Sequence, residues 1–420
     1  MTIASAADPA ALPIQKKNFR YVQIDAIGVG LASAAGPFLP VFLTKLNATP
    51  TQIGLLTTMP GVTGLFLALI VGRFLQTKSN IVPWFSVARL AVLSCYALTG
   101  LVPFFVPDEY VVVAILLIWA FATIPQTMVA IAFSVVMNAV AGPQGRYALM
   151  SRRWSILGLT SAITAAVVGQ VLDLIVFPLN YQVVFLGLSF GGLISYYFSS
   201  HIVLPEAKVP DQFTEKFSRN TIRHYSRLVL NEPAFVSFSL KRFVFLSGVA
   251  LAAPLFPLYF VKVVHASNAA IGLITTASTA VALIGYYFWP RQSRKRGSRF
   301  VLLCTTFGVS LYPALTAMTT NEHAIVLFAG LNGIFQAGLD LVFFDELMKT
   351  VPVDYSATFV SMAQSMQYLS TIASPLIGTF LAGYIGLAGA LLVSAAIRFS
   401  GFALFAMGKS VKTRQINSMS

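Results

Sequence analysis

Long apolar runs alternate with short polar segments along the whole chain. Each run is at least about 20 residues long, the length of helix that crosses the ~30 Å of hydrocarbon in a bilayer. Twelve runs can be delimited in this way, and we predict a transmembrane helix in each. The predicted spans are 21–44, 51–72, 81–106, 109–138, 154–178, 181–204, 233–261, 268–289, 300–320, 323–348, 355–381 and 385–408.

The longest polar segment, residues 205–232, lies near the middle of the chain. It divides the predicted spans into six on each side. The sequence therefore predicts an all-α membrane protein with an N-terminal six-helix bundle (residues 1–204), a cytoplasmic linker (205–232) and a C-terminal six-helix bundle (233–420).

The composition excludes a soluble protein of this length. Hydrophobic residues make up 57% of the chain and charged residues only 10%, whereas soluble domains carry about 25% charged residues. The two cysteines, Cys95 and Cys304, both fall inside apolar runs. We therefore expect buried thiols rather than a disulfide.

The positive charges lie almost entirely on one side of the predicted membrane. If both termini are cytoplasmic, the inner loops and tails hold 22 lysines and arginines and the outer loops hold two. This asymmetry is the positive-inside pattern of membrane proteins, and it predicts a multi-pass protein of the inner or plasma membrane. It also explains the net charge of +14 without any binding of nucleic acid.

Short stretches of the two halves repeat in the same order. Pro37–Pro40 (PFLP) recurs as Pro254–Pro257 (PLFP), and Ile53–Thr58 (IGLLTT) recurs as Ile271–Thr276 (IGLITT). The repeats indicate a parallel duplication of a six-helix unit, an architecture common among transporters. The paired prolines also predict a bend in spans one and seven, because proline removes a helix hydrogen bond.

The loop after the second span resembles a motif of the major facilitator superfamily, Gly-x-Leu-Ala-Asp-Arg-x-Gly-Arg-Arg. The stretch Gly72–Asn80 keeps the first glycine, but Gln76 replaces the acid and Ser79 the second glycine. The equivalent loop of the second half, Trp289–Arg299, keeps the basic residues, with Arg294 in place of the acid. The resemblance implies two six-helix bundles around a central cavity that opens alternately to either side of the membrane. It implies a transporter, without enzymatic activity and without a cofactor.

Several charged residues fall inside predicted spans, where insertion of a charge costs at least ~2.5–3.5 kcal/mol. Such residues are candidates for function. They are Asp25, Arg89, Lys241, Arg242, Asp340, Asp345, Glu346 and Arg398.

Asp25 and Arg242 occupy equivalent positions in the two halves, 217 residues apart. In the resembling family, spans one and seven face each other across the cavity. An ion pair between them would form when the cytoplasmic side closes and break when it opens, which would bias the two states. The alternative is a pair within the first half, between Asp25 and Arg89, which lies at similar depth on span three.

Asp340 is the deepest acid of span ten and admits two interpretations. Burial favours the neutral form of a carboxyl, so Asp340 could carry a coupling proton. Arg398 lies at similar depth on span twelve, and we favour a structural Asp340–Arg398 ion pair. Nearer the cytoplasm, Asp345 and Glu346 are expected to form an entrance network with Lys349.

Three amides are candidates for contact with a solute near the middle of the membrane: Gln126, Asn332 and Gln336. Asn332 and Gln336 share one helical face with Asp340. The sequence carries no nucleotide-binding loop, so we expect a gradient, most simply of protons, to drive transport. The predicted function is export of a small amphipathic molecule by a monomer. The alternatives are a nutrient importer and a non-transporting receptor or assembly factor on the same scaffold.

The charge asymmetry predicts the topology directly. Cysteines introduced at Ser79, Ser218 and Ser293 should react with an impermeant thiol reagent only from the cytoplasmic side, and a cysteine at Asn47 only from outside. The measurement is labelling of intact cells and of inverted vesicles. Labelling of Asn47 and Ser218 from the same side would contradict the twelve-span topology.

Overall fold

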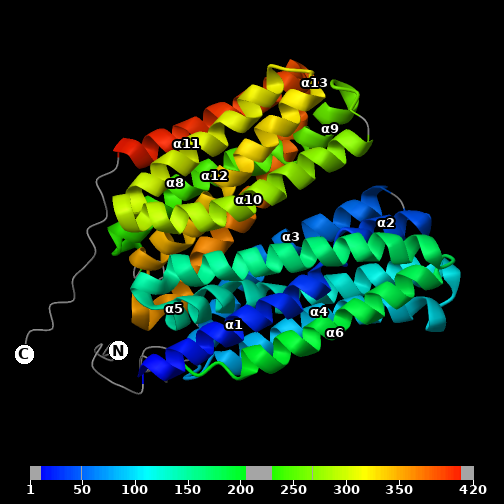
Figure 1. The fold of residues 1–420 in the computed structure, drawn as a ribbon, viewed down its shortest axis with the longest axis horizontal. Coiled ribbons are helices and arrows are strands. Elements are labelled where there is room, and N and C mark those ends of the chain that lie inside the picture. Colours follow the sequence, from blue (N-terminus) through cyan, green and yellow to red (C-terminus); the bar gives the residue numbers. More distant parts are fainter. Residues whose placement is uncertain (1–10, 49, 205–228, 267, 408–420) are drawn as a thin grey trace, which may run out of the picture. The chain divides into compact units, whose positions relative to one another are not determined.

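The computed structural model describes the chain except for residues 1–10, 49, 205–228, 267 and 408–420, and the described part consists of helices joined by short loops. The predicted linker 205–232 thus lies almost entirely outside the described residues. The first half contains the following helices: α1 (Ala11–Ser33), α2 (Phe38–Lys45), α3 (Pro50–Gln76), α4 (Val82–Phe105), α5 (Asp108–Leu174) and α6 (Leu179–Ser200) (Figure 1).

The second half repeats this order of elements. Its helices are α8 (Pro233–Ala252), α9 (Leu255–Lys262), α10 (Asn268–Arg296), α11 (Ser298–Ala317), α12 (Glu322–Thr350) and α13 (Ser356–Met407), with a short 3-10 helix, Val353–Tyr355, before α13.

The chain forms two compact units. The first comprises residues 1–216 together with Val353–Tyr368, and the second comprises residues 217–352 and 369–420. The beginning of α13 therefore packs with the helices of the N-terminal half, whereas the rest of α13 packs with the C-terminal helices.

The helices account for the twelve predicted spans. Nine stretches of the described chain are helical, long and apolar enough to cross a membrane. One of them, Val353–Met407, contains two helices that meet at Gly386. The part of α5 that follows Gly142 and the helix α10 supply the other two spans. The prediction of an all-α protein with six helices in each half is confirmed.

The predicted bends occur in spans one and seven. α1 ends at Ser33 and α2 begins at Phe38, directly after Pro37. In the second half, α8 ends at Ala252 and α9 begins at Leu255, directly after Pro254. The repeated prolines thus interrupt both helices at equivalent places.

The fourth loop is shorter than predicted. Hydropathy placed residues 139–153 outside the membrane, but the helix continues to Ala141 and resumes at Pro143 across the single kink at Gly142. Gly142 has a φ of 64°, a conformation that favours glycine, and proline is well suited to the first turn of a helix. Consequently Arg153 lies about three turns into a helix rather than in a loop.

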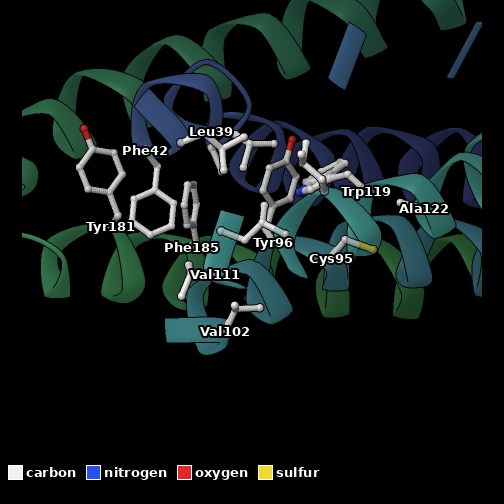
Figure 2. Close-up of a cluster of buried hydrophobic side chains, with 14 of the residues drawn as sticks. Leu39, Phe42, Cys95, Tyr96, Val102, Val111, Trp119, Ala122, Tyr181 and Phe185 are labelled. Carbon is white, nitrogen blue, oxygen red and sulfur yellow. The ribbon is translucent and has the colours of Figure 1, made fainter. Parts of the chain in front are cut away.

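Aromatic side chains form the core of the first unit (Figure 2). Phe42 stacks on Tyr181 with ring centroids 5.0 Å apart, and Tyr96 meets Trp119 edge to face at 4.9 Å. The indole nitrogen of Trp119 donates to the Thr99 hydroxyl at 3.1 Å. This core fastens the short helix α2 to α4, α5 and α6.

The second unit has a corresponding core around α9. Leu251, Leu255 and Tyr259 are buried in it, and Phe256 stacks on Tyr312 of α11 with centroids 4.8 Å apart. Both halves therefore anchor the short helix that follows the proline bend through aromatic packing.

α1 and α6 touch backbone to backbone. A β-carbon built on Gly191 would lie 2.4 Å from the carbonyl oxygen of Gly28, and one built on Gly28 would lie 2.5 Å from that of Gly191. Small residues of this kind let membrane helices approach closely. The close approach brings the next turn of α6, which carries Ser195, against α1.

Gly191→Ala should therefore separate α1 from α6 and lower the stability of the protein by about 1–3 kcal/mol, the usual cost of overpacking. The measurement is the apparent Tm of the purified protein in detergent. Gly187→Ala, on the same helix, is the matched control, because nothing lies within 4 Å of its β-carbon position. Equal Tm values for the two variants would contradict the close contact.

Candidate functional site

The first candidate site centres on Asp25, which is completely buried in α1. Arg89 of α4 donates through one amino group to both carboxylate oxygens, at 2.7 and 2.6 Å. The Ser195 hydroxyl of α6 donates to Oδ1 at 2.6 Å, and Nη2 of Arg153 on α5 lies 3.5 Å from Oδ2. Asp25 thus ties together four helices of the first unit.

Two arginines share this one carboxylate, so the cluster carries an excess positive charge. Aromatic rings offset part of it. The guanidinium of Arg89 lies 4.0 Å from the ring centroid of Phe85, and that of Arg153 lies 4.6 Å from the centroid of Phe133. A cation over a ring face gains about 0.5–2 kcal/mol, and the rings exclude water from the ion pair.

The pair within the first half, Asp25 with Arg89, is the arrangement that the structure shows. The Asp25–Arg242 gate stays a prediction. Arg242 lies on α8 in the second unit, with its guanidinium 5.9 Å from the ring centroid of Phe343. Its neighbour Lys241 is partly buried and makes no hydrogen bond or ion pair with any described residue.

Sequence reasoning missed Arg153 as a member of this cluster. Hydropathy assigned it to a cytoplasmic loop, and its charge counted only toward topology. The available signal was the Gly142-Pro143 pair, which marks a helix start ten residues earlier. A helix beginning there carries Arg153 about 15 Å along its axis, far enough to reach a buried acid.

The second candidate site centres on Asp340 of α12, in the second unit. The Tyr286 hydroxyl of α10 donates to Oδ2 at 3.2 Å, and the Gln336 amide, one turn earlier on α12, donates to Oδ1 at 2.8 Å. Both donors are neutral. Among the described residues no lysine or arginine lies within ion-pair distance of Asp340.

Close packing of α10 on α12 holds Tyr286 in place. The Trp289 indole donates to the carbonyl of Ile334 at 2.7 Å. A β-carbon on Gly285 would lie 2.8 Å from the same carbonyl oxygen, and one on Gly338 would lie 2.6 Å from the indole ring. The two glycines therefore let the helices come near enough for the hydroxyl of Tyr286 to reach Asp340.

Asn332 stands on the same face of α12, two turns before Asp340. Its amide oxygen is buried and has no hydrogen-bond partner in the described part of the chain. Asn332, Gln336 and Asp340 are all partly buried. The predicted polar stripe is therefore present on α12. Gln126 is likewise partly buried, on α5 after Pro125.

The predicted Asp340–Arg398 ion pair is wrong. Arg398 is 3% exposed, and its guanidinium donates to the carbonyl of Val309 on α11 at 3.1 Å. Its side chain packs on α8, where a β-carbon on Gly248 would lie 2.9 Å from Cγ of Arg398. Equal depth along two helices does not decide which way each side chain points, and Arg398 faces α8 and α11.

The predicted network near the end of α12 is present. The Lys349 ammonium lies 2.7 Å from a carboxylate oxygen of Asp345 and 2.7 Å from one of Glu346. Ser298, at the start of α11, accepts from Lys349 and donates to Glu346, both at 2.6 Å. These bonds fasten the end of α12 to α11.

Gln76 replaces the acid of the loop motif and still makes a contact in the first unit. Its amide donates to the backbone carbonyl of Asp354, just before α13. Gly72, one turn earlier, leaves room for Ser361, whose hydroxyl would lie 2.3 Å from a β-carbon. The end of α3 and the start of α13 are thus joined without an ion pair at Gln76.

The comparisons with known proteins agree with this architecture. Residues 238–418 match the family model of the Major Facilitator Superfamily. No curated protein matches the chain in sequence.

Three solved structures illustrate the likeness. A bacterial homologue of the iron transporter ferroportin in an outward-facing state is 16% identical, with a TM-score of 0.71 over 94% of this chain and 98% of that one. The human organic anion transporter MFSD10 (TETRAN) is 12% identical, with a TM-score of 0.72 over 93% and 99%. The fucose:proton symporter FucP of E. coli is 12% identical, with a TM-score of 0.71 over 92% and 97%. At these identities the likeness establishes the fold alone.

The Asp25 cluster predicts a large loss of stability when its acid is removed. Asp25→Asn leaves Arg89 and Arg153 buried without a carboxylate, and removing one partner of a buried pair costs about 3–5 kcal/mol. The apparent Tm in detergent should fall markedly. Adding Arg89→Gln to Asp25→Asn should recover part of the loss, because only Arg153 then remains uncompensated.

Asp108→Asn is the control for this experiment, since Asp108 is an exposed acid in the first turn of α5. Its Tm should match that of the unmodified protein. A Tm of Asp25→Asn that equals the control value would show that the buried ion pair contributes little to the fold.

Proposed function

We propose that the chain is a transporter of the Major Facilitator Superfamily type, which moves a small amphipathic organic solute by alternating access and secondary active transport. The two six-helix halves of the sequence, with bends at equivalent places in α1–α2 and α8–α9, support this proposal. Because the sequence contains no nucleotide-binding loop, the energy comes from a gradient. We take the coupling ion to be the proton.

The proposal of proton coupling rests on Asp340. A carboxyl inside a membrane-spanning helix needs either a cation or a proton to remove its charge. Asp340 is bonded only by the neutral donors Tyr286 and Gln336. Both can stabilise the ionised form, and neither blocks protonation. The group can therefore exchange a proton as the transporter changes state.

Asp25 has a different role in this proposal. Arg89 and Arg153 lie against its carboxylate, and two neighbouring cations favour the ionised form. It serves as an anchor of the first unit and carries no proton.

The direction we propose is export. The chain contains 34 phenylalanines, and an aromatic, apolar interior suits an amphipathic solute better than a sugar. Import of a nutrient is the alternative within the same architecture. A non-transporting receptor is the alternative from another class, because Gln76 replaces the acid of the loop motif. The bond from Gln76 to the Asp354 carbonyl favours a working transporter, since it joins α3 to the start of α13 without the acid.

Proton coupling at Asp340 predicts a specific loss of function. The protein is reconstituted into liposomes that contain the pH indicator pyranine, and sugars, carboxylates, amines and neutral aromatic compounds are added outside one at a time. With the unmodified protein, at least one solute should change the internal pH at least about tenfold faster than in protein-free liposomes. Asp340→Asn should abolish this difference, because an amide can neither release nor take up the proton.

Asp108→Asn is again the matched control and should transport as the unmodified protein does. An unmodified protein that moves no proton with any solute, while accelerating the flux of one of them, would contradict proton coupling. Acceleration of no solute at all would favour the non-transporting alternative.

A further inference from the structure

Five basic residues stand within nine positions where α10 ends and α11 begins, and no acid stands among them. They are Arg291, Arg294, Lys295, Arg296 and Arg299. The first four form no ion pair with an acid of the described chain. Topology alone does not require such a density of charge, since the equivalent loop after α3 has only Arg73 and Lys78.

The exposed side of α10 changes from apolar to cationic toward this end of the helix. Ile284, Tyr287 and Phe288 are exposed to 60%, 68% and 41%. The exposed residues that follow at the spacing of the same helical face are all basic: Arg291, Arg294 and Lys295. We call these six residues the α10 face.

The α10 face points away from the neighbouring helix α12. On the other side of α10, the Trp289 indole donates to the Ile334 carbonyl at 2.7 Å, and Gly285 packs against the same carbonyl. In a helix that crosses a membrane, an exposed apolar surface lies against lipid tails. From Ile284 to Lys295 the face runs roughly 16 Å along the axis, close to half of the ~30 Å hydrocarbon thickness. It therefore matches one leaflet.

Arg291 stands at the border between the two parts of the α10 face. Its guanidinium lies 3.4 Å from the ring centroid of Tyr287 and donates to the backbone carbonyl of that residue at 3.3 Å. These contacts place the charge directly beside an exposed aromatic ring, the kind of side chain that gathers at the level of the lipid headgroups. A guanidinium has five N–H donors, so Arg291 keeps donors for a ligand.

We propose that the α10 face binds an anionic phospholipid, whose acyl chains lie along Ile284 and Phe288 and whose phosphate is held by Arg291, Arg294 and Lys295. Guanidinium groups match the geometry of phosphate oxygens, and clusters of basic residues next to a membrane-spanning helix attract anionic lipids. A small anion would use only the basic part of the face. This inference does not depend on the proposed transport function.

The test is lipid binding by the purified full chain, measured by native mass spectrometry of the protein released from detergent micelles. The two probes have the same acyl chains: dioleoylphosphatidylglycerol, which carries a net negative charge, and dioleoylphosphatidylcholine, whose trimethylammonium group cancels the charge of its phosphate. At equal concentration, the anionic lipid should bind at least about fivefold more tightly. A hundredfold excess of inorganic phosphate should not displace it, because phosphate has no acyl chain.

The first variant combines Arg291→Gln, Arg294→Gln and Lys295→Gln. It should weaken binding of the anionic lipid at least about tenfold, because each basic residue at a membrane surface contributes about fivefold. Arg291→Gln alone should weaken it about fivefold. Neither variant should change binding of phosphatidylcholine, which thereby also shows that the variants are folded.

The matched control combines Lys16→Gln, Lys17→Gln and Arg20→Gln. It removes the same number of positive charges from exposed positions at the start of α1. Binding of the anionic lipid should be the same as in the unmodified protein.

Three results would overturn the inference. Equal affinity for the two lipids would remove the role of charge. An equal loss of affinity in the α1 control would indicate a general attraction between a basic protein and an anionic lipid. Displacement by inorganic phosphate would indicate a site for a small anion that needs no acyl chain. Each result can occur whether or not the protein transports a solute in liposomes.

Discussion

A charge inside a membrane must be compensated where it stands, and this constraint organises the interior of the protein. Each uncompensated charge costs at least ~2.5–3.5 kcal/mol at the centre of a helix on insertion scales. The chain meets the cost in three ways. Asp25 has two arginines, Asp340 has two neutral donors, and Arg398 donates to one backbone carbonyl while its Nε has no hydrogen-bond partner among the described residues.

The three solutions differ in what they permit. A carboxylate held by Arg89 and Arg153 is paired with positive charge, and such a pair favours its ionised form, so it suits a structural anchor. Neutral donors are compatible with both states of a carboxyl, and this is why we propose Asp340 as the residue that exchanges a proton. Two aspartates buried in membrane helices thus have different partners, charged ones in the first unit and neutral ones in the second.

The hydrogen bonds and ion pairs of Asp25 and Asp340 depend on helices that approach one another unusually closely. Gly28 and Gly191 bring α6 to α1, and Gly285 and Gly338 bring α10 to α12. In a membrane, lipid tails are as apolar as leucine side chains, so close packing and hydrogen bonds hold the helices together. The small residues and the polar bonds thus support each other.

The sequence was sufficient for the features that depend on hydropathy, proline and helix period. The twelve spans, the bends after Ser33 and Ala252, and the stripe from Asn332 to Asp340 all follow from such patterns. The sequence did not predict which charged side chains pair with one another, because pairing depends on how each helix is rotated about its own axis. Asp340 and Arg398 lie at similar depth but face different neighbours. Arg153 was missed for another reason: α5 resumes directly after Gly142, where hydropathy placed a loop.

The turns at Gly142 and Gly386 have backbone angles that decide which enantiomer of an amino acid could replace the glycine. Their backbone angles are nearly the same, with φ and ψ of 64° and 171° at Gly142 and of 75° and 167° at Gly386. This region is essentially restricted to glycine, yet nothing lies within 4 Å of either β-carbon position. The restriction is therefore one of handedness rather than of space. The mirror image of these angles is an ordinary extended conformation, so both turns would accept D-alanine without strain and resist L-alanine.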